Sequence, residues 1–260
     1  MNQRQKRLSV RFVAMTALLS AAPIHGALAQ VPAPALGTAS NFAVLGGSAV
    51  TCDSIGAIGP ASGVAGDVGS LTSITGFPTL CTLAGTAHVN DAAANQAVVD
   101  FHLAYAAMSD RMDLACPSSD ATHNIDGDLT GLTLTPGVYC IGSAAPALLS
   151  GQLTLDALGV QEAVWIFKSA TAITPIGGSV VMAGSGTACN VYWQASTLVS
   201  LNNTDFLGNI LAGTAVSFTG VGSTLIGRVF GDSGVTITGG AAISIGDCGP
   251  TDRIFANGFE

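Results

Sequence analysis

The sequence contains few charged residues, and cations are scarcer than anions. Asp, Glu, Lys and Arg make up 9% of its 260 residues, with eight Lys and Arg against sixteen Asp and Glu. Nucleic acids and anionic membrane surfaces are bound mainly through clustered Lys and Arg, so neither is an expected partner. Disorder is also excluded, because disordered chains have few hydrophobic residues, whereas these make up 48% here.

Apolar runs of the ~20 residues that span a bilayer are also missing. The run Phe12 to Ala22 is shorter, and the small-residue pattern Ala27-Leu28-Ala29 follows it. Half of the cations precede this run: Arg4, Lys6, Arg7 and Arg11. These features are typical of a signal peptide, which we expect to span residues 1–29 and to be cleaved near Ala29. We therefore expect a secreted or cell-surface protein that is not inserted in a membrane.

Closely spaced cysteines are absent as well. No two of the six cysteines lie within four residues of each other, which argues against a zinc knuckle. An even number in an exported chain favours disulfides, although the sequence leaves all fifteen pairings open. Pairing in sequence order is our working hypothesis: Cys52 with Cys81, Cys116 with Cys140, and Cys189 with Cys248.

Residues suited to catalysis are sparse and scattered. His88, His102 and His123 show neither metal-ligand nor catalytic-triad spacing. Asp126-Gly127-Asp128 lacks the further ligands of a calcium loop and is read as a turn. Enzymes that cleave polysaccharides need clustered carboxylates, but the available residues fall in different segments: Asp205, Asp232 and Lys168. We predict a non-enzymatic protein without metal or cofactor.

One segment has helical periodicity. From Ala94 to Met112, apolar residues recur at spacings of three and four. Asn90 can cap the start of a helix, and Pro117 lies just beyond its end. The pattern predicts a helix from Asp91 to Met112, packed alongside a β structure.

The rest of the sequence has the two-residue period of β-strands, and a longer repeat follows the helix. Strand-like segments beginning at Val164, Val191, Asn209 and Arg228 start 27, 18 and 19 residues apart. Each is followed by two more short strands. Three strands per repeat predict a triangular β-solenoid, in which each coil buries its apolar edge by stacking on its neighbours. A β-sandwich is the alternative, with strands 8–12 residues apart and no such register.

The second strand of each repeat carries Thr or Ser beside an aliphatic residue. If Ile173, Val199, Val216 and Val235 point inward, the residues that follow them point outward. The first predicted column contains Thr174, Ser200, Ser217 and Thr236, with Thr75 from a similar N-terminal segment. The second contains Asn202, Thr219 and Thr238. The neighbouring positions are small at Ala172, Ala215 and Gly234, which keeps the face flat, and Leu198 interrupts it.

Such a face suits ice binding on physical grounds. Stacked strands repeat at ~4.8 Å, close to a repeat of the ice lattice. Threonine is stiff at χ1, so a column can hold hydroxyls and methyls in register, and a rigid surface avoids an ordering cost on binding. Threonine is also a good outward strand residue in general. A structural or adhesive surface module without ice affinity is therefore the alternative function.

Several segments resemble the microbial ice-binding proteins with the discontinuous β-solenoid fold. The most specific are Leu134-Thr135-Pro136-Gly137-Val138-Tyr139 and Cys189-Asn190-Val191-Tyr192-Trp193-Gln194. Further matches occur at 36–48, 66–69, 74–78 and 163–167, so that the resemblance runs from Leu36 to Ile245.

The resemblance implies a right-handed, three-faced solenoid flanked by the helix, within a domain of residues 30–249. It also implies adsorption to an ice surface through one flat face, with inhibition of ice growth or recrystallisation. The expected partner is thus ice with its ordered water, and we expect a monomer. Residues 250–260 lie beyond the resemblance and are expected to form a C-terminal tail for sorting or secretion.

Overall fold

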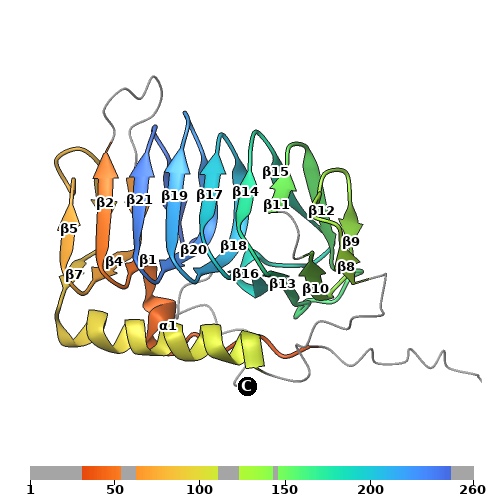
Figure 1. The fold of residues 1–260 in the computed structure, drawn as a ribbon, viewed down its shortest axis with the longest axis horizontal. Coiled ribbons are helices and arrows are strands. Elements are labelled where there is room, and N and C mark those ends of the chain that lie inside the picture. Colours follow the sequence, from red (N-terminus) through yellow and green to blue (C-terminus); the bar gives the residue numbers. More distant parts are fainter. Residues whose placement is uncertain (1–30, 54–62, 111–122, 143–145, 247–260) are drawn as a thin grey trace, which may run out of the picture.

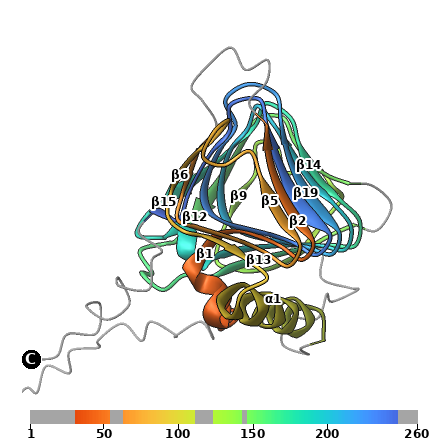
Figure 2. The same ribbon diagram turned by 90° about the vertical axis from the view of Figure 1, so that its left-hand side faces the viewer.

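The computed structural model describes residues 31–53, 63–110, 123–142 and 146–246. This part of the chain is mostly β with one long helix, as predicted. The paired strands run parallel to one another in stacked columns (Figure 1). Viewed end-on, the stack has a triangular outline, and helix α1 lies outside one side of it (Figure 2).

The first side of the triangle is the helix-covered face. Its neighbouring strands pair in register, for example Val138 with Ile166 and Ile166 with Tyr192. In spatial order the strands are β8 (Asn124–Ile125), β10 (Gly137–Ile141), β13 (Trp165–Ser169), β16 (Val191–Ala195), β18 (Asp205–Ala212), β20 (Thr224–Gly231), β1 (Phe42–Gly46), β4 (Asp67–Ser70) and β7 (Ala87–Val89).

A second side, the mixed face, shares β18 and β20 with the first. Its other strands are β9 (Thr133–Leu134), β12 (Gln152–Asp156), β15 (Ser179–Ala183), β22 (Ala242–Ser244), β3 (Gly63–Ala65) and β6 (Thr82–Ala84). Both shared strands turn the corner at glycine, since Gly208 and Gly227 are paired and have φ of 110° and 145°. A Cβ on Gly227 would lie 2.0 Å from the Gly208 carbonyl oxygen, so this corner requires glycine.

The third side is a separate seven-stranded sheet, called here the seven-stranded face. In spatial order it contains β11 (Ala147–Leu149), β14 (Ile173–Pro175), β17 (Val199–Asn202), β19 (Ala215–Thr219), β21 (Gly234–Thr238), β2 (Ala49–Asp53) and β5 (Ser73–Thr75). Figure 1 views the molecule from this side, with these strands upright across the front.

The order of the strands in the stack differs from their order in the sequence. The N-terminal strands β1 and β2 pair with the C-terminal strands β20 and β21. Arg228, which is 3% exposed, ties the two segments together, because its guanidinium donates to the Ser40 carbonyl (2.8 Å) and to Asn209 Oδ1 (3.0 Å). Helix α1 (Ala92–Asp110) then carries the chain along the stack before strand formation resumes at β8 (Figure 1).

Helix α1 is fixed at its start and along its length. The predicted cap at Asn90 is wrong: Asp91 Oδ1 accepts from the Ala94 N–H (2.8 Å), whereas Asn90 has φ of 50°. That hydrogen bond and the one to His88 lower the pKa of Asp91. The predicted end, Met112, lies outside the described residues. The apolar side of the helix packs on the helix-covered face through Ala97, Val98, Phe101, Ala104 and Met108.

Inside the triangle, an aromatic ladder links neighbouring strands. Tyr139, Phe167, Trp193 and Phe206 stack with successive ring-centroid distances of 5.4, 3.9 and 4.7 Å. Trp193 is fully buried, and its indole N–H donates to the Leu207 carbonyl (2.8 Å). The ladder therefore contributes both apolar burial and a satisfied polar group to the core.

We expect Trp193→Ala to lower the free energy of unfolding by about 3–5 kcal/mol, since it leaves a cavity in the centre of this ladder. Trp193→Phe keeps the ring stack and should cost distinctly less. Urea denaturation of both variants checks this. Equal losses would show that the stacking contributes nothing.

A second prediction concerns Asp100, which joins α1 to the N-terminal 3-10 helix (Gly37–Asn41). Its Oδ2 accepts from the N–H and the hydroxyl of Thr38, both at 2.7 Å, and these bonds lower its pKa below 3.8. Because the pKa of Asp100 is lower in the folded state than the ordinary value of 3.8, its ionised carboxylate stabilises the fold above pH 3.8. This stabilisation is lost as the pH falls through the folded-state pKa. The stability difference between wild type and Asp100→Asn should therefore shrink below that pH. Denaturation curves from pH 2 to 7 test this, and a constant difference would contradict it.

Candidate functional site

Six consecutive strands of the seven-stranded face carry threonine or serine at one register position. The register pairs Ser200 with Ser217, Ser217 with Thr236, Thr236 with Thr51, and Thr51 with Thr75. Thr174 continues the row, because the preceding residues Ile173 and Val199 are paired. This first column thus contains all five residues predicted for it. It also contains Thr51 of β2, which the sequence analysis missed.

The second predicted column lies two residues further along the same strands. Asn202 pairs with Thr219, and Thr238 follows Ile237, which pairs with Phe218 beside Thr219. The Thr238 hydroxyl donates to the Phe218 carbonyl (2.7 Å), so this side chain is held against the neighbouring strand. The column ends in residues of other types, with Ile176 bridging to Asn202 and Asp53 pairing with Thr238.

The core side of the sheet explains why these columns point outward. Ile173, Val199, Val216, Val235 and Val50 are all 2% exposed or less. Side chains alternate along a strand, so the residues next to them face solvent. The first-column residues are accordingly half-buried or exposed. The predicted orientation of the four aliphatic residues is therefore confirmed.

A further row of Thr and Ser, which the sequence analysis did not include among the site residues, lies just before each of these strands begins. Backbone hydrogen bonds connect Thr197 to Thr171, Thr214 to Thr197, Ser233 to Thr214, and Thr72 to Ser48. The sequence signal is a four-residue motif, Thr or Ser, any residue, an aliphatic residue, then Thr or Ser. It occurs at 171–174, 197–200, 214–217, 233–236, 48–51 and 72–75. Searching the N-terminal segment for this motif would have found Thr51.

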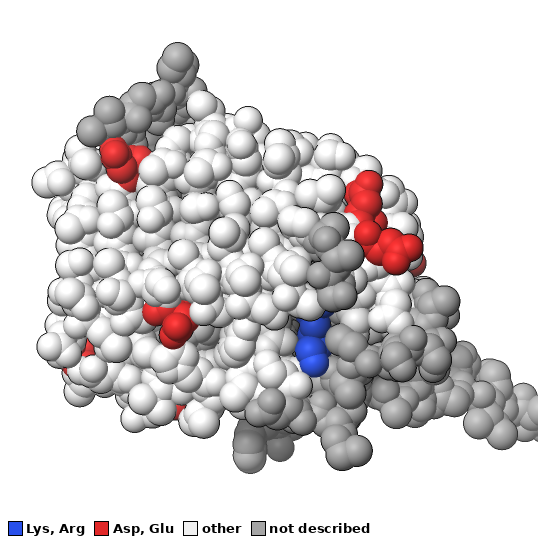
Figure 3. Space-filling view, in the orientation of Figure 1, with Lys and Arg blue, Asp and Glu red and all other residues white. Residues whose placement is uncertain are grey.

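The face carries almost no charge. Among the described outward positions on its strands, Asp53 is the single ionisable residue, and it lies at the end of the second column. Figure 3 shows a broad uncharged area over these strands, with carboxylates toward its margins. The surface can therefore offer hydroxyls and methyls to a ligand without a strong electrostatic field.

A disulfide lies beneath one end of the face. Cys52, next to Thr51 on β2, is bonded to Cys81 just before β6, which confirms this predicted pair. The Thr75 hydroxyl donates to the Thr51 hydroxyl (3.3 Å), joining β5 to β2 at the surface. Cys140 and Cys189 are also disulfide-bonded. Their predicted partners, Cys116 and Cys248, lie outside the described residues, so those two pairings stay predictions.

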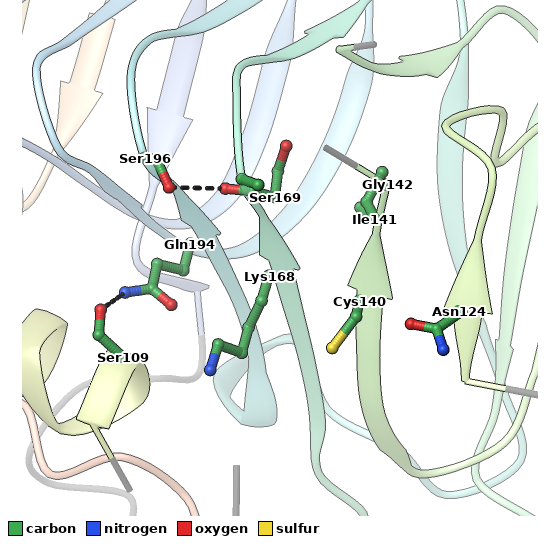
Figure 4. Close-up of a pocket in the computed structure, with 10 residues that line it drawn as sticks. Ser109, Asn124, Cys140, Ile141, Gly142, Lys168, Ser169, Gln194 and Ser196 are labelled. Carbon is green, nitrogen blue, oxygen red and sulfur yellow. Dashed lines mark hydrogen bonds between the residues drawn. The ribbon is translucent and has the colours of Figure 1, made fainter. Parts of the chain in front are cut away.

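A cavity of about 470 Å³ lies elsewhere, between strands β10, β13 and β16 and the end of α1 (Figure 4). Gln194 reaches from β16 to the helix, where its amide donates to the Ser109 hydroxyl (2.6 Å), and Lys168 lies on the neighbouring strand. The described lining includes no carboxylate. Asp205 instead accepts from Thr224 on the mixed face, so the structure does not bring it together with Lys168.

Two of the histidines each contact a different carboxylate. His88, on β7, contacts Asp91 (2.7 Å), whereas His102, on α1, contacts Asp232 (2.7 Å). Within the described ranges, no group of three or more His, Cys, Asp or Glu residues is placed to hold a metal ion. In the same described ranges, no helix is long and apolar enough to cross a membrane.

Comparisons with known proteins all lead to one family. The family model described as Ice-binding-like matches residues 44–244. An ice-binding protein of Nostoc sp. (strain HG1) is 40% identical over 200 residues, which are 76% of this chain and 69% of that protein. A crystal structure of an ice-binding protein from an Antarctic biological consortium has a TM-score of 0.73 at 36% identity, covering 84% of this chain and 93% of the other. Another, from the Antarctic ascomycete Antarctomyces psychrotrophicus, has a TM-score of 0.70 at 30% identity, covering 82% and 98%.

The Cys52–Cys81 disulfide allows a test of how much this bond stabilises the protein beside the seven-stranded face. Replacing both Cys52 and Cys81 with Ala should lower the free energy of unfolding by about 3 kcal/mol, because the bond closes a long loop, at a sequence separation of 29. Chemical denaturation of the double variant measures this without reducing the other cysteines. A loss below about 0.5 kcal/mol would show that the strand pairing of β2 suffices without the bond.

Proposed function

Since this chain belongs to the Ice-binding-like family, we propose that it adsorbs to ice through its seven-stranded face and thereby restrains ice growth or recrystallisation. The observation that carries the proposal is the first column, an unbroken row of Thr or Ser across six strands in register. The site residues are those of the first column, Thr75, Thr51, Thr174, Ser200, Ser217 and Thr236, and those of the second, Asn202, Thr219 and Thr238.

The spacing of this column suits a crystal. Strands in one sheet are ~4.8 Å apart, so the hydroxyls repeat at about that distance, close to a repeat of the ice lattice. Each threonine is stiff at χ1 and places its methyl beside its hydroxyl. Water held in register by such a row can merge with a growing crystal face, and little side-chain entropy is lost on binding.

The other two sides of the molecule support this assignment by contrast. The helix-covered face is buried under α1, with Phe101 packed against Phe230 (centroids 5.7 Å apart). On the mixed face, the row that contains Thr224 continues into Asp205, whose carboxylate accepts from that threonine (2.6 Å). Exposed Ile226 projects from the same face. Neither side offers the regular, uncharged row found on the seven-stranded face.

Finer features of the proposal follow the same reasoning. We take the parallel columns and triangular outline as support for a three-faced β-solenoid. We propose in addition that the solenoid is right-handed and that the protein acts as a non-catalytic monomer. The basic and apolar leader at 1–29 and the Cys52–Cys81 bond support export to an oxidising compartment. Residues 30–249 would then form the mature domain, followed by the tail at 250–260.

The experiment is to place two large side chains on the centre of the face. We expect Ser217→Tyr combined with Thr236→Tyr to reduce ice-recrystallisation inhibition at least tenfold, because the aromatic rings hold the crystal away from the first column. Recrystallisation assays over a protein dilution series measure the change, and circular dichroism checks the fold.

The matched control is Thr133→Tyr, which adds the same ring at an exposed strand position on the mixed face. It should leave activity unchanged. Full activity in the double variant would exclude the seven-stranded face as the site. Inactivity of the wild type would instead favour the structural or adhesive module.

A further inference from the structure

We infer that adsorption is concentrated at one end of the seven-stranded face, on strands β19, β21, β2 and β5, and that exposed apolar side chains limit it at the other end. The inference rests on the proposed function and assigns unequal roles to residues within one column. It makes Thr51 a principal contact and Thr174 a minor one, although both belong to the first column.

At the β19–β5 end, the outward side chains are all small, and none has more non-hydrogen atoms than that of aspartate. They are Ala215, Ser217, Thr219, Gly234, Thr236, Thr238, Ala49, Thr51, Asp53, Ser73 and Thr75. Those that pair across the strands form rows of like size, such as Ala215 with Gly234 and Gly234 with Ala49. A flat crystal plane can therefore touch several rows here at once.

At the other end, three large apolar side chains stand in the same surface. Leu148, Ile176 and Leu198 are 45%, 60% and 42% exposed. Leu148 pairs directly with Thr174, and Ile176 bridges to Asn202. Their side chains extend beyond a threonine hydroxyl, so a flat crystal plane resting on them stands away from Thr174.

The flat end is held by a disulfide and by side-chain hydrogen bonds. The Cys52–Cys81 bond holds β2 from the core side, and the Thr75 hydroxyl donates to Thr51 at the surface (3.3 Å). The Thr238 hydroxyl is held by the Phe218 carbonyl (2.7 Å). Side chains ordered before binding lose less entropy when the crystal forms on them.

The test compares two positions related by place in the sheet. Thr51 and Thr174 lie in the same column, are both half-buried, and each lies on the second strand from an edge. We expect Thr51→Tyr to reduce recrystallisation inhibition at least tenfold and Thr174→Tyr, at a minor contact, to reduce it by about two- to threefold. Thermal melting of both variants checks that the fold is retained.

A third variant tests the limiting role of the apolar side chains. Leu148→Thr, Ile176→Thr and Leu198→Ala together extend the flat surface toward β11, and should raise activity at least twofold. Melting temperature again serves as the check on folding.

The outcomes separate the inference from the proposed function. Equal losses at Thr51 and Thr174, or lower activity in the triple variant, would overturn the inference while leaving the seven-stranded face as the site. Full activity in Thr51→Tyr would overturn the inference as well. The proposed function itself would be overturned by an inactive wild type or by full activity in the Ser217→Tyr and Thr236→Tyr double variant.

Discussion

The face depends on the register in which β2 pairs with β21. This pairing sets Thr51 beside Thr236 and, through β5, brings Thr75 into the same row. A slip of one residue would turn the hydroxyls into the core and expose Val50 and Ile74, because side chains alternate along a strand. Burial of Val50, at 0% exposed, holds the register by the hydrophobic effect. The same apolar contact that stabilises the stack therefore aligns the proposed site.

That pairing joins parts of the chain that are far apart in sequence. The N-terminal strands close the stack against the C-terminal ones, and Arg228 reinforces the junction through Ser40. Helix α1 makes this order possible, since it runs along much of the stack and covers the side that would otherwise expose Phe230 and Tyr192. The proposed binding surface and the helix are thus both consequences of one chain path.

Much of this could be predicted from local patterns. The helix followed from apolar spacing, and the strand columns after it followed from a repeat with a constant motif. Thr51 is found only when the motif is also sought before the helix, because β2 joins the same sheet through tertiary pairing and not through the repeat that follows the helix. The cap at Asp91 rather than Asn90 was missed for a smaller reason. Asn90 and Asp91 are adjacent, and both residue types are good N-caps, so the sequence does not distinguish them. In the structure Asn90 has a left-handed backbone, and Asp91 accepts the capping hydrogen bond.

In the proposed function, an uncharged row of hydroxyls and methyls, aligned by parallel pairing, recognises ice. A direct experiment is to let ice grow slowly through a dilute solution of the oxidised protein and to measure how the protein divides between ice and liquid. We expect strong enrichment in the ice fraction relative to a non-binding protein of similar size and charge. Exclusion into the liquid to the same degree as that reference protein would contradict it.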